Sequence, residues 1–154
     1  MSDRQDRLSS MALTVFALNG RFLKIADQLA EPAGLTATRW QVLGAVLNEP
    51  LTQAEIARRM GITRQSVQRT SSQLIEDGMI QFMPNPSHRK AMLLTPTEKG
   101  LEAIEKIGPQ HAEFAKQLET KLGKERMAEL SEALTELQCA LEADGLQESE
   151  DPAS

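Results

Sequence analysis

On one face of a helix, residues 65–72 would present four polar side chains of the types that recognise the edges of DNA bases. Arg pairs with guanine, Gln with adenine, and Ser with either. With 3.6 residues per turn, Val67, Ser71 and Leu74 share one face of a helix, and the four polar residues point away from it. The four are Gln65, Gln68, Arg69 and Ser72. An outward face of this composition indicates base recognition, with an ordinary solvated helix face as the alternative.

The element that must present these side chains is the second of two short helices within residues 52–77. Thr52 can cap the first helix, and Glu55 can reach back to close a capping box. Thr63 can cap the second. Between the two helices, Gly61 supplies a residue that is free to take a positive φ. This layout predicts a helix-turn-helix.

A β-hairpin is expected directly after the second helix, which Gly78 terminates. Residues 79–83 and 90–94 are the two apolar runs, and Pro84, Asn85, Pro86 and Ser87 are typical of a turn between them. His88, Arg89 and Lys90 lie near the tip. The position of this hairpin predicts a wing, and the alternative is a surface hairpin with basic residues by chance. Residues 36–95 are therefore expected to form one winged unit, with an additional helix at 36–47.

Long helices are expected on both sides of the winged unit. Residues 8–30 carry two apolar strips on different faces, so this helix has two surfaces to bury. Association with a second subunit is one solution, and complete burial within the chain is the other. A helix that starts at Thr95-Pro96 and runs to about Leu122 should kink or break at Gly108-Pro109, and a last helix should span 124–143. Residues 144–154 are predicted to be a disordered tail.

The distribution of charge is more informative than the net charge of −5. Residues 51–95 hold six basic and three acidic side chains, whereas residues 96–154 hold six basic and fourteen acidic ones. The basic middle of the chain can therefore face phosphate, while the acidic end stays away from it.

Several classes of protein are disfavoured by composition. The chain has no apolar run long enough for a signal or a membrane span, and its single cysteine excludes an intrachain disulfide and a cysteine-cluster metal site. Two histidines far apart do not form a metal site. There is no phosphate-binding glycine loop or nucleophile motif, so neither an enzyme nor a cofactor is expected. A cytoplasmic protein fits these features best.

The phrases LTATRWQVL, LTQAEIARRMGITRQSVQRTSSQLIEDGMI and HRKAMLLTPTEKG resemble those of the MarR family of bacterial transcription regulators, from about residue 8 to 143. The resemblance implies a mainly α fold of order α-α-α-α-β-β-α-α, with dimerisation helices at 8–30 and 96–143. It also implies a homodimer that binds a palindromic site in double-stranded DNA.

The resemblance assigns roles to individual residues. Gln65, Gln68, Arg69 and Ser72 would face the major groove. Thr63, Arg64 and Ser66 would hold phosphates at the helix N-terminus, Arg89 would enter the minor groove, and Lys90 would lie beside it. One departure concerns the wing, where Asn85 and His88 stand at positions that are often acidic in the family and brace the arginine. This departure predicts a less preorganised Arg89.

Members of the family commonly lose DNA on binding a small aromatic or anionic effector. His111 lies on an apolar stripe, where it is either a packed histidine or part of a ligand pocket with Trp40. Cys139 is a poor oxidant sensor, because nearby glutamates disfavour the thiolate that sensing requires. The expected function is that of a ligand-responsive repressor. The alternatives are a winged-helix dimer that binds protein and an architectural DNA-binding protein of low specificity.

Overall fold

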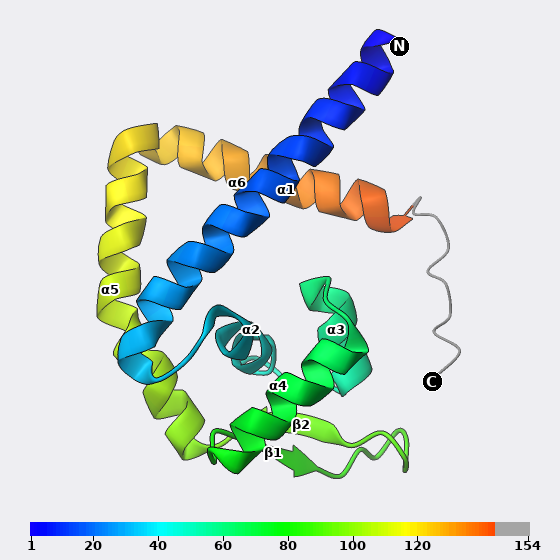
Figure 1. Cartoon of the computed structure of the whole chain (residues 1–154), viewed down its shortest axis with the longest axis vertical. Helices are drawn as coiled ribbons and strands as arrows, with labels where there is room; N and C mark the ends of the chain where they lie inside the picture. The colour runs from blue at the N-terminus through cyan, green and yellow to red at the C-terminus, as the bar shows by residue number, and fades with distance from the viewer. Residues whose placement is uncertain (144–154) are drawn as a thin grey trace. The chain divides into compact units, whose positions relative to one another are not determined.

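The computed structural model describes residues 1–143, and the tail expected at 144–154 lies outside them. The chain forms two compact units, Met1–His111 and a second unit that begins at Ala112. The elements in chain order are α1 (Asp3–Ala30), a 3-10 turn η1 (Glu31–Ala33), α2 (Ala37–Ala45), α3 (Gln53–Met60), α4 (Arg64–Glu76), β1 (Ile80–Met83), β2 (Leu93–Pro96), α5 (Glu98–Leu122) and α6 (Lys124–Ala143) (Figure 1). The predicted mainly α order is confirmed.

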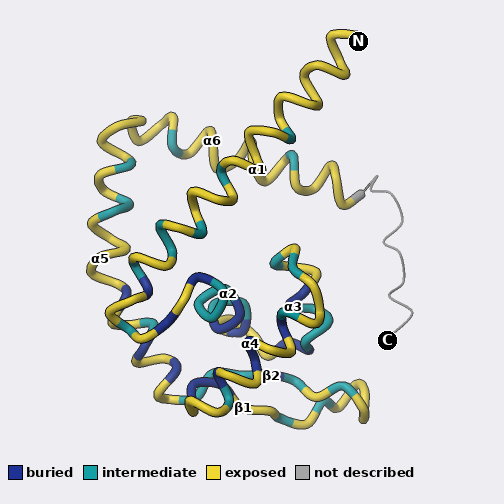
Figure 2. Tube along the Cα trace, viewed as in Figure 1, coloured by how far each residue is buried: buried dark blue, intermediate teal, exposed yellow. Residues whose placement is uncertain are grey.

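The hydrophobic core of the first unit lies where α2, α3, α4 and the hairpin meet (Figure 2). Three of its members are spaced along α4 and α2 so that the two helices bury facing stripes: Leu43, Val67 and Leu74 are all fully buried. Leu51 pairs with Leu94 through a short β-bridge, which ties the segment before α3 to the hairpin. The start of α5 completes the core with Ala103 and Ile107.

The helix starts within the winged unit follow the capping residues. The hydroxyls of Thr36, Thr52 and Thr63 each accept a hydrogen bond from the backbone amide three residues later, at 3.1–3.2 Å. Asp27 of α1 adds a second contact for α2, because its carboxylate accepts from the amide of Ala37 at 2.6 Å. Gly61 ends α3 with a φ of 65°, as the turn of the helix-turn-helix requires.

The first helix begins earlier than the apolar pattern indicated, at Asp3 in place of residue 8. Ser2 and Gln5 form a capping box, in which the hydroxyl of Ser2 accepts from the amide of Gln5 and the Gln5 side chain accepts from the amide of Ser2. The capping signal therefore lay in the polar segment that precedes the first apolar residue.

The hairpin pairs its strands further along the chain than predicted. The second strand is Leu93–Pro96 and not residues 90–94, with Phe82 opposite Leu94 and Ile80 opposite Pro96. A proline is tolerated at this place because a two-stranded ribbon leaves the outward N–H position of each strand unpaired. Residues 84–92 therefore form a longer loop, which is called the wing loop below.

Helix α5 begins at Glu98, so Thr95-Pro96 is not its start. Thr97 caps the helix: its hydroxyl accepts from the amide of Gly100 at 3.1 Å and donates to the carbonyl of Gly78 at 2.6 Å. The helix remains α-helical through Pro109 to Leu122, so of the kink or break predicted at Gly108-Pro109 the break is wrong. The boundary between the two units falls just after this proline, at His111.

The helices outside the winged unit expose much apolar surface. On α1, Leu13 and Phe16 are 68% and 70% exposed, and Ala30 is the one fully buried residue of that helix. In the second unit, Leu134 and Leu141 of α6 are 48% and 58% exposed. Packing within the first unit therefore leaves the apolar faces of α1 largely uncovered, and association with a second subunit stays a prediction.

Candidate nucleic-acid interface

The two faces of α4 differ as the wheel predicted. Val67, Ser71 and Leu74 are fully buried, and Thr70 is 5% exposed beside them. The opposite face projects into solvent. Its exposed members include Gln65, Gln68, Arg69 and Ser72. The core thus fixes the rotation of the helix, and that rotation leaves outward the four side chains predicted to contact bases.

Ser72 and Arg69 on this face keep hydrogen-bonding groups that can contact an external partner. The hydroxyl of Ser72 donates to the carbonyl of Gln68 at 2.9 Å, so its lone pairs remain for an external donor. The guanidinium of Arg69 is exposed and takes part in none of the ion pairs found among residues 1–143.

The N-terminus of α4 carries the three residues expected to hold phosphates. Thr63 and Arg64 are exposed, whereas Ser66 is half-buried. The amide of Ser66 is already used by the hydroxyl of Thr63 at 3.1 Å. The amides of Arg64 and Gln65 are therefore the first-turn donors that this cap leaves for an anion.

A set of hydrogen bonds that the sequence did not predict holds the C-terminal end of α4. Arg39 of α2 donates to the side chains of Gln73 and Asp77, each at 3.4 Å. Lys99 of α5 donates to the carbonyl of Asp77 at 2.7 Å. Arg39 and Asp77 are 38 positions apart, and no periodicity or capping motif links them. Contacts from two other helices thus fix the direction in which α4 points.

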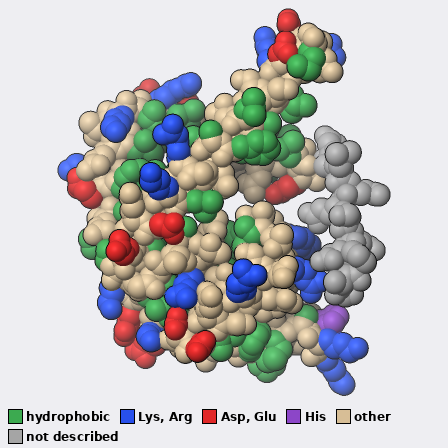
Figure 3. Space-filling model, viewed as in Figure 1, with side chains coloured by type: hydrophobic (Ala, Val, Ile, Leu, Met, Phe, Trp, Pro, Cys, Tyr) green, Lys and Arg blue, Asp and Glu red, His purple; other side chains and the backbone are tan. Residues whose placement is uncertain are grey.

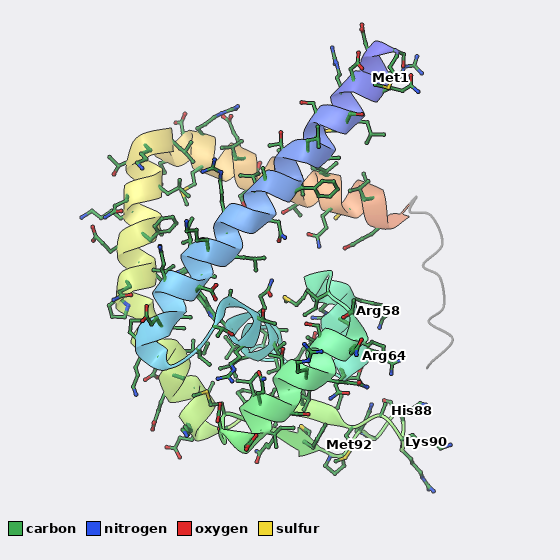
Figure 4. The ribbon with its side chains drawn as sticks, viewed as in Figure 1. Met1, Arg58, Arg64, His88, Lys90 and Met92 are labelled. Carbon is green, nitrogen blue, oxygen red and sulfur yellow. The ribbon has the colours of Figure 1, made fainter. Side chains whose placement is uncertain are left out.

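The wing loop presents Arg89 and Lys90 to solvent. Asn85 and His88 hydrogen-bond the loop backbone at Ala91 and at their own neighbours. Arg89 takes part in none of the ion pairs found among residues 1–143, so its lower preorganisation stays a prediction, whereas Asn85 and His88 hold the loop backbone at Ala91. Figure 3 shows Lys and Arg side chains beside a histidine at one edge of the molecule, and Figure 4 places His88 and Lys90 there.

Arg58 is a further basic residue that was not among the predicted site residues. It lies in the last turn of α3, six positions before Arg64, and it is exposed. Figure 4 shows both arginines at the edge that also carries the wing. The adjacent Arg59 is different, because its guanidinium donates to the carboxylate of Glu49 at 2.9 Å. The signal available in the sequence was the Arg58-Arg59 pair directly before the turn.

The structure brings together Trp40 and His111, the two residues proposed for a ligand pocket. Their ring centroids lie 5.8 Å apart with planes at 80°, an edge-to-face arrangement. Trp40 is half-buried and His111 is exposed. Cys139 lies on α6 and is exposed as a free thiol.

Two further observations bear on other classes of site. Within residues 1–143, no helix is both long and apolar enough to cross a membrane. The same residues hold no group of three or more His, Cys, Asp or Glu side chains that could bind a metal ion.

Comparison with known proteins identifies a family and relatives to which this chain is similar. A family model described as the MarR family matches residues 33–91. An uncharacterised protein of Mycobacterium tuberculosis is 36% identical over 102 residues, which cover 66% of this chain and 71% of that protein.

Two solved structures share the fold at low identity. A cysteine-to-serine mutant of MarR from E. coli complexed with operator DNA has a TM-score of 0.72 at 18% identity, covering 88% of this chain and 99% of that one. Staphylococcus aureus MarR in complex with salicylate and kanamycin also has a TM-score of 0.72, at 21% identity, covering 92% of this chain and 97% of that one. This chain therefore belongs to the MarR family, whose members are transcription regulators and not enzymes.

Proposed function

We propose that this protein is a sequence-specific transcriptional repressor that binds a palindromic DNA operator as a homodimer. The single observation that carries the proposal is the rotation of α4. Its buried stripe at Val67, Ser71 and Leu74 leaves an outward face that carries Gln65, Gln68, Arg69 and Ser72. Side chains of these types, on a helix of this length, suit the major groove.

In this proposal the DNA-binding domain spans residues 36–95. Gln65, Gln68, Arg69 and Ser72 contact base edges. Thr63, Arg64 and Ser66 hold phosphates, and Arg89 and Lys90 on the wing loop extend the contact. The basic balance of residues 51–95 favours this surface over the acidic C-terminal helices as the one that faces DNA.

The helices at 8–30 and 96–143 would join two protomers. Exposed apolar side chains on α1 and α6, including Phe16 and Leu141, support this assignment, because large apolar patches on a single chain mark surfaces that associate. A dimer sets the distance between two copies of α4, and it thereby sets the spacing of two half-sites.

The repressor would release DNA when a small aromatic or anionic effector binds. Trp40 and His111 support such a site, since an aromatic ring and an imidazole in contact can pack against an aromatic acid. Trp40 and His111 both belong to the first unit, so the effector would bind within that unit.

In vitro selection from random double-stranded DNA with the purified full-length protein tests the proposal. We expect enrichment of a palindrome. Broad enrichment without a motif would favour an architectural protein of low specificity, and no enrichment would favour a winged-helix module that binds protein.

A further inference from the structure

The side chains of Asn85 and His88 form hydrogen bonds with the backbone on the opposite side of the wing loop, and these bonds are called the brace below. The amide nitrogen of Asn85 donates to the carbonyl oxygen of Ala91 at 2.9 Å. The backbone amide of Ala91 donates to Nδ1 of His88 at 3.3 Å. Both polar backbone groups of Ala91 are therefore engaged by side chains from earlier in the loop, and Arg89 and Lys90 lie inside the closed segment.

The same two residues also fix the first half of the loop. The side-chain oxygen of Asn85 accepts from the amide of Ser87 at 3.0 Å, and its backbone carbonyl accepts from the amide of His88 at 3.2 Å. An Asx turn and a backbone turn thus both begin at Asn85, and local sequence can specify them without help from the core. Asn85 is half-buried among its neighbours, whereas His88 is exposed.

We propose that Asn85 and His88 are positioning residues, which hold the wing loop in the conformation that presents Arg89 to DNA. The inference rests on the proposed function, in which Arg89 contacts DNA. A loop that is ordered before binding avoids the conformational entropy that a free loop loses on contact.

The uncharged side chains of Asn85 and His88 also suit binding to the phosphates of DNA. Residues 84–92 contain no Asp or Glu, so the brace places no negative charge beside Arg89 and Lys90. A carboxylate in either position would neutralise part of the positive charge that DNA phosphates attract. Asn85 and His88 therefore order the wing loop without reducing its positive charge.

The first test examines the brace without DNA. A ring nitrogen that accepts a hydrogen bond carries no proton, so the neutral imidazole of His88 must hold its proton on Nε2. Long-range proton–nitrogen NMR spectra of the labelled full-length protein distinguish the two tautomers, and His88→Asn assigns the signal. We expect the Nε2–H form, and a predominant Nδ1–H form would overturn the brace.

The second test compares variants on the operator found by selection. His88→Ala should raise Kd about fivefold, in line with the loss of one hydrogen bond, and Asn85→Ala, which removes two, should raise it further. His88→Asn keeps an acceptor at the position of Nδ1 and should bind like wild type. His88→Gln, whose acceptor lies further out, should resemble His88→Ala. Arg89→Ala is the reference variant, because its Kd gives the largest loss of affinity that displacement of this arginine can cause.

Measuring operator affinity over a range of salt concentrations tests whether the variants lose the contact of Arg89 with DNA. Each phosphate contact contributes about 0.9 to the slope of log K against log salt, so a displaced Arg89 should lower that slope in the Ala and Gln variants. Equal affinity of His88→Asn and His88→Gln would overturn the positioning role. If the wild-type protein binds no DNA, the proposed function fails with it, while an Nδ1–H tautomer of His88 would overturn the hydrogen bond to Ala91 independently of DNA.

Discussion

Gly100 of α5 packs directly against the backbone carbonyl of Met79, at the point where α4 turns into the hairpin. A Cβ atom at position 100 would collide with that carbonyl and would press on the side chain of Leu43. The amide of Thr97 donates to the same carbonyl at 3.0 Å. The start of α5 and the end of α4 are thus joined through backbone, which leaves little freedom for one to move without the other.

Gly100→Ala should destabilise the protein, because the obstructing group is backbone and cannot rotate away. We expect a loss of about 3 kcal/mol, or a fall in Tm of about 5–10 °C, measured by thermal unfolding at fixed protein concentration. Gly44→Ala is the matched control, since a Cβ there meets nothing within 4 Å. A Tm for Gly100→Ala equal to that of the control would show that the junction can relax.

Arg69→Ala should weaken binding to the selected operator by about 1–3 kcal/mol and should relax the preference at one base position. The expectation follows from the exposed guanidinium on the outward face of α4. Competition binding against operators with single base changes measures both effects. A uniform loss of affinity across all of these sequences would instead identify Arg69 as a phosphate contact.

Arg58 and Arg59 form a natural pair for testing how far the phosphate-binding surface extends. Arg58 is exposed near the start of α4, whereas Arg59 is bound to Glu49 at 2.9 Å. Arg58→Ala should lower the slope of log K against log salt by about 0.9, and Arg59→Ala should change it less. Fluorescence anisotropy over a range of salt concentrations gives both slopes. Equal slopes for Arg58→Ala and wild type would exclude α3 from the interface.

Trp40 is the single tryptophan of the chain, so its fluorescence reports on the proposed effector site without a label. Benzoate and related phenolic or carboxylate compounds should change this emission in a saturable way and should raise Tm. His111→Ala should weaken both effects, because its ring lies 5.8 Å from that of Trp40. If no compound in such a screen produces a shift, the protein is better described as a constitutive repressor.

The sequence predicted the winged unit well because its determinants are local. Thr36, Thr52 and Thr63 cap their helices, and the apolar spacing of α4 fixed which side would be buried. Errors arose where two local signals competed. Thr95-Pro96-Thr97-Glu98 reads as a helix start at Thr95, but strand pairing with Ile80 holds Pro96 in the hairpin, so Thr97 becomes the cap.

Contacts between residues far apart in the chain could not be read from periodicity. Arg39 with Asp77, Lys99 with the end of α4, and Gly100 with Met79 all depend on how helices pack in three dimensions. The proximity of Trp40 and His111 was anticipated as one of two readings of an apolar stripe. The hydrogen bonds of Asn85 and His88 to Ala91 were not predicted, because they depend on where the loop backbone returns, which residue types alone do not specify.

Hydroxyl-radical footprinting of the protein on its selected operator tests the central claim most directly. If a homodimer places two copies of α4 in successive major grooves, two symmetric protected regions should appear, centred about one helical turn, or roughly 34 Å, apart. Arg89→Ala should shrink the protection at the outer edges, where the wing loops would lie. A single protected region, or protection without symmetry, would contradict recognition of a palindrome by a dimer.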